Sequence, residues 1–239
     1  MVEKNVLPSR ERAKRSIMAG LVLVNDVRVD KAGTLVHRNA RITLKGNDMP
    51  YVSRGGLKLA PSLKESGIEL NGRTALDVGA STGGFTDCLL QHGISRVYAV
   101  DVGYGQLDWR LRQDERVVVI ERTNIRHMPY ERINDTVDLV VIDTSFISLK
   151  IVIPAAEKFM KDGTTVFALI KPQFEAGRDR VEKGGVVRDE ATVKAVIEDV
   201  ASFCRNRGYT VQSIRPSPVP GPKGNLEYII SLKSMTEHD

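Results

Sequence analysis

The stretch ALDVGASTGGFTD (75–87) decides the fold, because it joins a buried strand to a helix through a glycine-rich bend. The run TALDVG (74–79) is short and apolar, as expected of a strand buried in a parallel sheet. STGGF (81–85) supplies the conformational freedom of a tight turn, and a helix then runs to about His92. A strand, a glycine bend and a helix form the first half of a βαβ unit, which binds ligands at the carboxyl end of its strand.

Strand-like and helix-like segments alternate through the rest of the chain. Further strands are predicted at RVYAVD (96–101), VVVIE (117–121), VDLVVID (137–143), TTVFALIK (164–171), YTVQSIRP (209–216) and LEYIISL (226–232). Helices are predicted at 57–67, where Pro61 should limit the start, at 107–112, after Leu149, and over 190–207. This alternation predicts an α/β fold, with a Rossmann-like, doubly wound and mainly parallel sheet.

The first part of the chain has a different pattern and a different charge. Residues 9–20 predict a helix capped by Ser9, residues 21–29 a hairpin that turns at Asn25-Asp26, and residues 41–46 a short strand. Residues 1–60 hold 12 Lys or Arg and 5 Asp or Glu, whereas the remaining residues hold 23 and 25. A basic module beside a near-neutral body is typical of nucleic-acid binders, although a solubilising surface would give the same composition.

The domain organisation follows from these patterns. Gly, Pro, Asn and Ser gather in GNDMPYVSRGG (46–56), as in a linker. We therefore expect a small α+β domain at 1–47, a linker at 48–56 and the α/β domain at 57–239.

Several classes of protein are excluded by the composition. Two cysteines, Cys88 and Cys204, cannot build a disulfide framework or a zinc cluster, and the four histidines are scattered. Neither a signal peptide nor an apolar run of membrane-spanning length is present. We expect a soluble cytoplasmic protein with no metal site and no membrane partner.

The glycine bend and the acid that ends the second strand predict a cofactor site. Helix-start N–H groups can bind a carboxylate, and Asp101 can accept hydrogen bonds from two ribose hydroxyls. The spacing G-x-S-x-G-G differs from that of dinucleotide binders, although a generic βα turn or an NAD site remains compatible with the fold. The residues expected to bind the cofactor are Asp77, Gly79, Ala80, Ser81, Gly83, Gly84, Phe85, Thr86, Asp101, Asn124 and Asp143.

Four charged residues are candidates for catalysis because of where they fall. Asp143 and Lys171 end two predicted parallel strands, and Glu227 begins the last strand, which reaches the same edge if it is antiparallel. Lys58 lies just before the Rossmann-like part. A lysine at the end of an apolar strand is partly desolvated, which favours the neutral amine that base chemistry needs. Each residue alone could be an ordinary strand-end charge.

These motifs make the chain resemble the TlyA/hemolysin A family of rRNA 2′-O-methyltransferases, which carry an FtsJ-like catalytic domain. The resemblance covers nearly the whole chain and rests on VSRGGLKL, LDVGASTGGFTDCLL, VIDTSFISL, LIKPQFE and GNLEYI. It implies S-adenosylmethionine as the cofactor and a catalytic tetrad of Lys58, Asp143, Lys171 and Glu227. By this resemblance Lys171 acts on the ribose 2′-hydroxyl, Asp143 and Glu227 position Lys171, and Lys58 orients the substrate.

The resemblance also implies the partner of the basic module. Residues 1–47 look like the alpha-L RNA-binding domain of a small-subunit ribosomal protein, without the further helix that family members have before SRERAKR. The implied substrate is a cytidine 2′-hydroxyl in ribosomal RNA within ribosomal subunits. Phosphate contacts are expected from Arg10, Arg12, Lys14, Arg15 and Arg54, so that affinity should fall with salt.

Three other functions fit parts of the sequence. A haemolysin is suggested by the family's older name, and a non-catalytic ribosome-assembly factor by the basic module. An NAD-dependent oxidoreductase is suggested by the fold alone. The segment 173–190 is either a mobile lid over the RNA or an exposed insertion.

Overall fold

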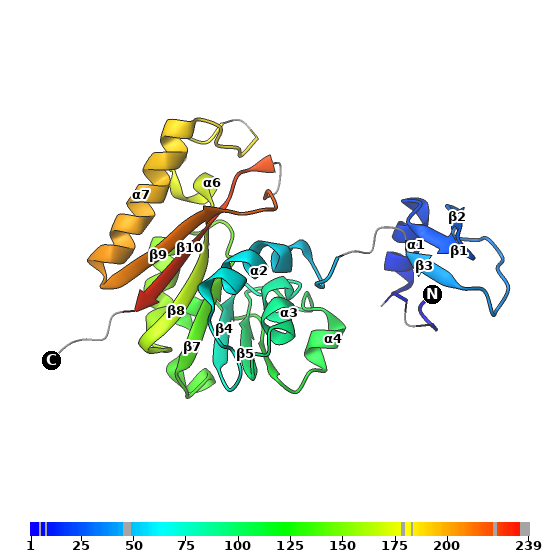
Figure 1. Cartoon of the computed structure of the whole chain (residues 1–239), viewed down its shortest axis with the longest axis horizontal. Helices are drawn as coiled ribbons and strands as arrows, with labels where there is room; N and C mark the ends of the chain where they lie inside the picture. The colour runs from blue at the N-terminus through cyan, green and yellow to red at the C-terminus, as the bar shows by residue number, and fades with distance from the viewer. Residues whose placement is uncertain are drawn as a thin grey trace. The chain divides into compact units, whose positions relative to one another are not determined.

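The chain forms two compact units, Met1–Pro50 and Tyr51–Asp239 (Figure 1). The structure is a computed structural model that describes all residues except 5, 8, 45–48, 178–179, 183, 222–223 and 235–239. The boundary between the units lies within the expected linker, and a helix of the larger unit already begins at Arg54. Among the described residues, no helix is long and apolar enough to cross a membrane.

The smaller unit packs one helix, α1 (Arg10–Met18), with a three-stranded antiparallel sheet. The strands β1 (Val22–Val24), β2 (Val27–Val29) and β3 (Ile42–Leu44) lie in the order β2-β1-β3. The predicted hairpin forms because Asn25 and Asp26 both take positive φ, at 50° and 66°, as a two-residue turn between twisted strands requires. The predicted helix cap also forms, since the Ser9 side chain accepts the Arg12 N–H.

The larger unit is a seven-stranded sheet with helices on both faces. Its elements are α2 (Arg54–Ser66), β4 (Thr74–Val78), α3 (Gly84–Gln91), β5 (Arg96–Val100), α4 (Trp109–Arg112), β6 (Val117–Ile120), the 3-10 turns η1 (Ile125–His127) and η2 (Tyr130–Arg132), β7 (Val137–Ile142), α5 (Leu149–Glu157), β8 (Met160–Ile170), α6 (Pro172–Glu175), α7 (Glu190–Asn206), β9 (Tyr209–Pro216) and β10 (Tyr228–Ser234). The strand order is β6-β5-β4-β7-β8-β10-β9, and β10 runs antiparallel to both neighbours. The order reverses between β4 and β7, which is where ligands bind in open α/β sheets.

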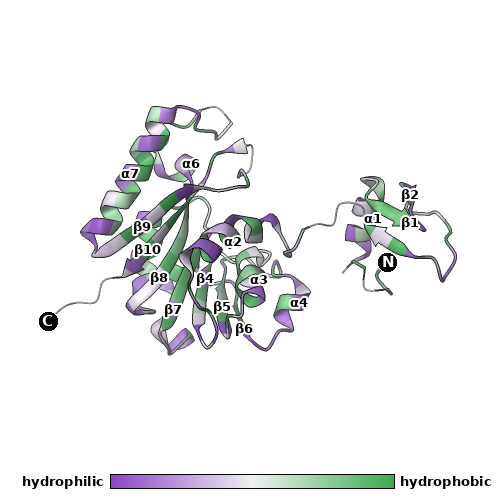
Figure 2. Ribbon diagram, in the orientation of Figure 1, coloured by the Kyte–Doolittle hydropathy of each residue, from purple (hydrophilic) through white to green (hydrophobic). Residues whose placement is uncertain are grey.

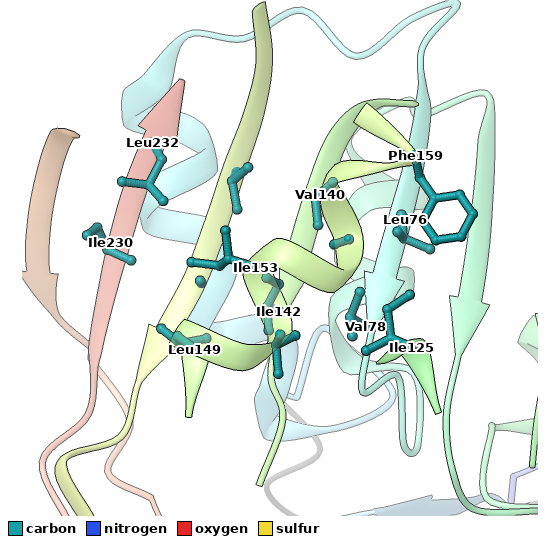
Figure 3. Close-up of a cluster of buried hydrophobic side chains, with 14 of the residues drawn as sticks. Leu76, Val78, Ile125, Val140, Ile142, Leu149, Ile153, Phe159, Ile230 and Leu232 are labelled. Carbon is teal, nitrogen blue, oxygen red and sulfur yellow. The ribbon is translucent and has the colours of Figure 1, made fainter. Parts of the chain in front are cut away.

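Two hydrophobic cores lie on the two faces of this sheet, because successive strand residues point to opposite sides. In β7, Val140 and Ile142 join the core that α5 and α7 cover, and Leu139 and Val141 join the core that α2 and α3 cover. Figure 3 shows the first core, in which Ile153 of α5 lies over the strands. Figure 2 shows hydrophobic residues along the central strands, and hydrophilic residues that alternate with hydrophobic ones along α7. The two cores together bury both faces of the central strands.

Two predicted elements are longer than expected. Helix α2 begins at Arg54 rather than Leu57, because Ser53 caps it by accepting the Gly55 N–H at 3.3 Å. Pro61 does not limit its start: the helix continues through the proline, because the opposite side of the helix is fixed by Leu59 and other buried residues. Strand β8 begins at Met160 rather than at 164, with an irregularity in its pairing to β7.

Candidate active site

The structure brings the four candidate catalytic residues together in one chain of ion pairs. Glu227 Oε2 lies 2.6 Å from Lys58 Nζ, which lies 3.9 Å from Asp143 Oδ2. Asp143 Oδ1 in turn lies 2.5 Å from Lys171 Nζ, which also donates to Ser145 Oγ at 3.2 Å. Two lysines and two carboxylates therefore alternate at the carboxyl edge of the sheet.

The strand pattern explains this meeting. Asp143 and Lys171 directly follow the neighbouring parallel strands β7 and β8. The antiparallel strand β10 starts opposite the end of β8, with Tyr228 paired to Ile170, so Glu227 arrives at the same level. Helix α2 contacts β10 and carries Lys58 to this edge.

Three charged side chains of this cluster are buried, so each needs a partner of opposite charge. Lys58, Lys171 and Glu227 are only 8%, 6% and 1% exposed. A charged group that leaves water at such a site is destabilising unless an opposite charge and hydrogen bonds compensate it. The alternation of lysines and carboxylates supplies this compensation, and it holds both Nζ atoms in fixed positions.

Glu227 has a different partner from the one that the family resemblance implies. It pairs with Lys58, whereas among the described contacts Lys171 pairs with Asp143 and Ser145. The other carboxylate oxygen, Oε1, is buried without a hydrogen-bond partner in the described structure. It packs against Gly221, where an added Cβ would lie 2.0 Å from Oε1. Glu227 is therefore placed to fix Lys58.

A cavity of about 740 Å³ opens at the point where the strand order reverses, a size within the range of small-ligand sites. Gly79 and Ser81 of the glycine bend line it, together with Asp101 and Asn124 from the ends of the next two strands. A Cβ added at Gly79 would lie 2.8 Å from the Asp143 carbonyl oxygen, so glycine lets β4 and β7 approach here.

Asp101 is already oriented by the backbone around it. Its Oδ2 accepts the Ser81 N–H at 2.8 Å, and its Oδ1 accepts the Gly103 N–H at 2.6 Å. Ser81 adopts a positive φ of 49°, a conformation that non-glycine residues rarely take. The Asp101 carboxylate thus joins the glycine bend to the end of β5 at the cavity.

Three residues expected at the cofactor, Asp77, Gly83 and Thr86, line neither this cavity nor the smaller one beside it. Asp77 is completely buried, and its Oδ2 accepts the Thr86 hydroxyl at 2.7 Å. Burial raises the pKa of Asp77 to about 7, and the Thr86 hydrogen bond opposes this shift. Gly83 packs against the side chain of Leu111. Asp77 and Thr86 support the bend from within the protein, because alternate strand residues and the inner face of α3 point into the core.

A second, smaller cavity of about 290 Å³ adjoins the first. Lys58, Lys171 and Arg54 line it, as do the predicted residues Ala80, Gly84 and Phe85. Four residues line both cavities: Gly79, Ser81, Asp143 and Ser145. The Lys171–Asp143 pair therefore lies where two sites meet.

Ser145 was not anticipated from the sequence. It lines both cavities and accepts a hydrogen bond from Lys171. The signal was present in VIDTSF, where a hydroxyl residue follows the strand-end acid by two positions. A loop conformation, rather than a periodic pattern, brings it to the lysine.

The residues expected to contact RNA lie in two places. Arg10, Arg12, Lys14 and Arg15 are exposed on α1 of the smaller unit. Arg54 is exposed at the first position of α2 in the larger unit. Among the described residues, no group of His, Cys, Asp and Glu could hold a metal ion.

Comparison with known proteins gives matches over nearly the whole chain. Residues 51–234 match the family model of the FtsJ-like methyltransferases, and residues 1–42 match the S4 domain. The chain is 42% identical to the Mycobacterium tuberculosis 16S/23S rRNA (cytidine-2′-O)-methyltransferase TlyA, over 99% of this chain and 89% of that protein. It is 41% identical to Hemolysin A of Brachyspira hyodysenteriae, over 92% of each. A solved structure of a candidate hemolysin from Streptococcus thermophilus is similar with a TM-score of 0.78 at 43% identity, over 96% of this chain and 84% of that one.

Proposed function

This chain belongs to the FtsJ-like methyltransferase family, and from that premise we propose that it methylates a cytidine ribose 2′-hydroxyl in ribosomal RNA, with S-adenosylmethionine as the methyl donor. One observation carries the proposal. The buried Lys171–Asp143 pair lies where a cavity of cofactor size meets a second polar cavity. A methyl donor and a ribose hydroxyl can approach the same lysine from these two sides.

The residues of the larger cavity fit S-adenosylmethionine. Gly79 lets β4 and β7 approach at the wall of the cavity, Asp101 offers a carboxylate to ribose hydroxyls, and Asn124 lines the same cavity. When bound, the cofactor supplies a methyl group activated by a positively charged sulfur. The protein then has to supply positioning and proton handling.

Lys171 handles the proton. In its neutral form, its Nζ accepts the hydrogen of the 2′-hydroxyl, and the resulting ammonium stays paired with Asp143. Ser145 holds the same Nζ from another direction. Lys58, fixed by Glu227 and lining the smaller cavity, orients the incoming nucleotide.

The smaller unit contributes RNA affinity. The S4 match covers α1, whose exposed Arg10, Arg12, Lys14 and Arg15 can contact phosphates without reading sequence. Arg54 adds a cation beside the smaller cavity. Ribosomal subunits in the cytoplasm are the proposed partner, and binding should weaken as salt rises.

Transfer of the labelled methyl group from S-adenosylmethionine to unmodified ribosomal subunits tests the proposal. Wild type should label one nucleotide, which then resists alkaline cleavage, whereas Lys171→Ala should bind the cofactor and transfer no methyl group. Lys161→Ala is a matched control, because Lys161 is an exposed lysine at the opposite end of β8 that pairs with Asp138 away from the site. Undiminished transfer by Lys171→Ala would remove Lys171 from the mechanism, and absence of cofactor binding by wild type would overturn the function.

A further inference from the structure

Two segments that follow neighbouring strands contact each other along their length. One is the loop 143–148 between β7 and α5, and the other is Lys171 with the short helix α6. Lys171 contacts Asp143 and Ser145 at the near end. Farther along, the rings of Phe174 and Phe146 lie 4.9 Å apart between centroids.

Glu175 closes the far end of this contact. Its Oε2 accepts the Ser148 hydroxyl at 2.5 Å, and its Oε1 accepts the Leu149 N–H at 2.8 Å. The Ser148 hydroxyl oxygen also accepts the Lys150 N–H at 3.1 Å, so Glu175 and Ser148 together cap the start of α5. A carboxylate is favoured at this end of a helix by the helix dipole.

The Glu175 carboxylate is partly buried. Burial raises its pKa, and the hydrogen bonds from Leu149 and Ser148 act in the opposite direction. Lys150 of α5 and Asp199 of α7 are the nearby charges that act on it.

The loop that Glu175 anchors contains a strained residue. Phe146 adopts a φ of +64°, which costs a non-glycine residue about 1–3 kcal/mol and persists only where the surroundings determine it. Its side chain is 89% exposed, so its own burial does not hold it. The loop depends on its two ends: the Asp143 N–H donates to the Val78 carbonyl at 3.1 Å, and Glu175 holds the other end.

We infer that Glu175 is a positioning residue for methyl transfer: through Ser148 and Leu149 it fixes the loop that presents Asp143 and Ser145 to Lys171. The inference rests on the proposed function. Glu175 ends the short helix that begins directly after Lys171, and it contacts the loop through Ser148 and Leu149.

The test compares kcat at saturating cofactor and ribosomal subunits with the cofactor Kd. Glu175→Ala should lower kcat by about 10-fold to 100-fold, the effect of a small displacement of reacting groups, and change the Kd less than about threefold. Glu175→Gln should recover most of the rate, because its amide can accept from Leu149 and donate to Ser148. Glu198→Ala is the control, because Glu198 is an exposed residue of α7 that binds Ser202 and Arg205.

A double-mutant cycle separates positioning from general stability. Glu175→Ala and Ser145→Ala should be non-additive in log kcat, since both act on the same loop. If Glu175→Ala folds poorly, Ser148→Ala removes one of the two contacts more mildly and should show the same non-additivity. An unchanged kcat in Glu175→Ala, or strict additivity in the cycle, overturns the inference. An inactive wild type in the same assay would refute the proposed function instead.

Discussion

Substitution of Glu227 by glutamine tests whether the buried ion pair at the site also stabilises the fold. Glu227 Oε2 is 2.6 Å from Lys58 Nζ, and both side chains are buried. Glutamine has nearly the same shape and keeps an oxygen that can accept from Lys58. The substitution therefore removes one negative charge from a cluster of two lysines and two carboxylates, and little else.

The expected loss in the free energy of unfolding follows from the surroundings of Lys58. Removing one member of a buried ion pair costs about 3–5 kcal/mol, because the remaining charge is left in a site with little water. Asp143 remains 3.9 Å from Lys58 Nζ and compensates part of this charge, so we expect a loss near the lower limit, about 3 kcal/mol. For a unit of this size, that loss corresponds to a fall in Tm of about 6–12 °C.

Tryptophan fluorescence during thermal unfolding is the suitable assay, because the chain has a single tryptophan, Trp109, in the larger unit. Glu65→Gln is the control: Glu65 lies on α2 and pairs with Arg215 at the surface, where an ion pair contributes at most about 1 kcal/mol. Adding Lys58→Met to Glu227→Gln should restore part of the Tm without restoring methyl transfer. A Tm for Glu227→Gln equal to that of the control would refute the reasoning.

Two further predictions concern the glycine bend and the acid beneath it. Gly79→Ala should lower the affinity for the cofactor more than tenfold in titration calorimetry, because the added Cβ would meet the Asp143 carbonyl. Gly72→Ala is the control, because Gly72 has a similar positive φ with open space around it, and this variant should bind the cofactor normally. Equal affinities for the two variants would contradict this reasoning. Because burial raises the pKa of Asp77 to about 7, the folded chain binds a proton that the unfolded chain has released between about pH 4 and 7. The free energy of unfolding should therefore fall as pH rises through this range and level off above it, and urea unfolding of Asp77→Asn should lack the decline; parallel pH curves for wild type and variant would be the contrary result.

The sheet and much of the site could be predicted because strand ends are visible in the sequence. Asp143 and Lys171 each terminate an apolar run, and parallel strands bring such ends to one edge. The antiparallel course of β10, on which the placement of Glu227 depended, is confirmed. The partner of Glu227 could not be predicted, because it depends on how α2 crosses this edge. Asp77 was assigned to the cofactor because it stands beside the bend, although its side chain points below it.

Other features lie outside what periodicity encodes. The start of α2 depends on the Ser53 cap, which outweighs the effect of Pro61 within the same helix. Segment 173–190 begins within α6, and residues 178–179 and 183 of it lie outside the described residues. The Asn225 side chain accepts the Val187 N–H and donates to the Gly185 carbonyl of this segment. Whether it closes over RNA stays a prediction.

The bond between Lys58 and Glu227 joins residues 169 positions apart. We expect a contact of such sequence separation to form after much of the sheet has assembled, because the closure of so long a loop is opposed by chain entropy. The cluster at the site is thus complete only when β10 pairs with β8. A chain in which β10 has not yet paired has a cofactor bend but no complete charge cluster. Formation of the cluster therefore reports that the sheet has closed as far as β10.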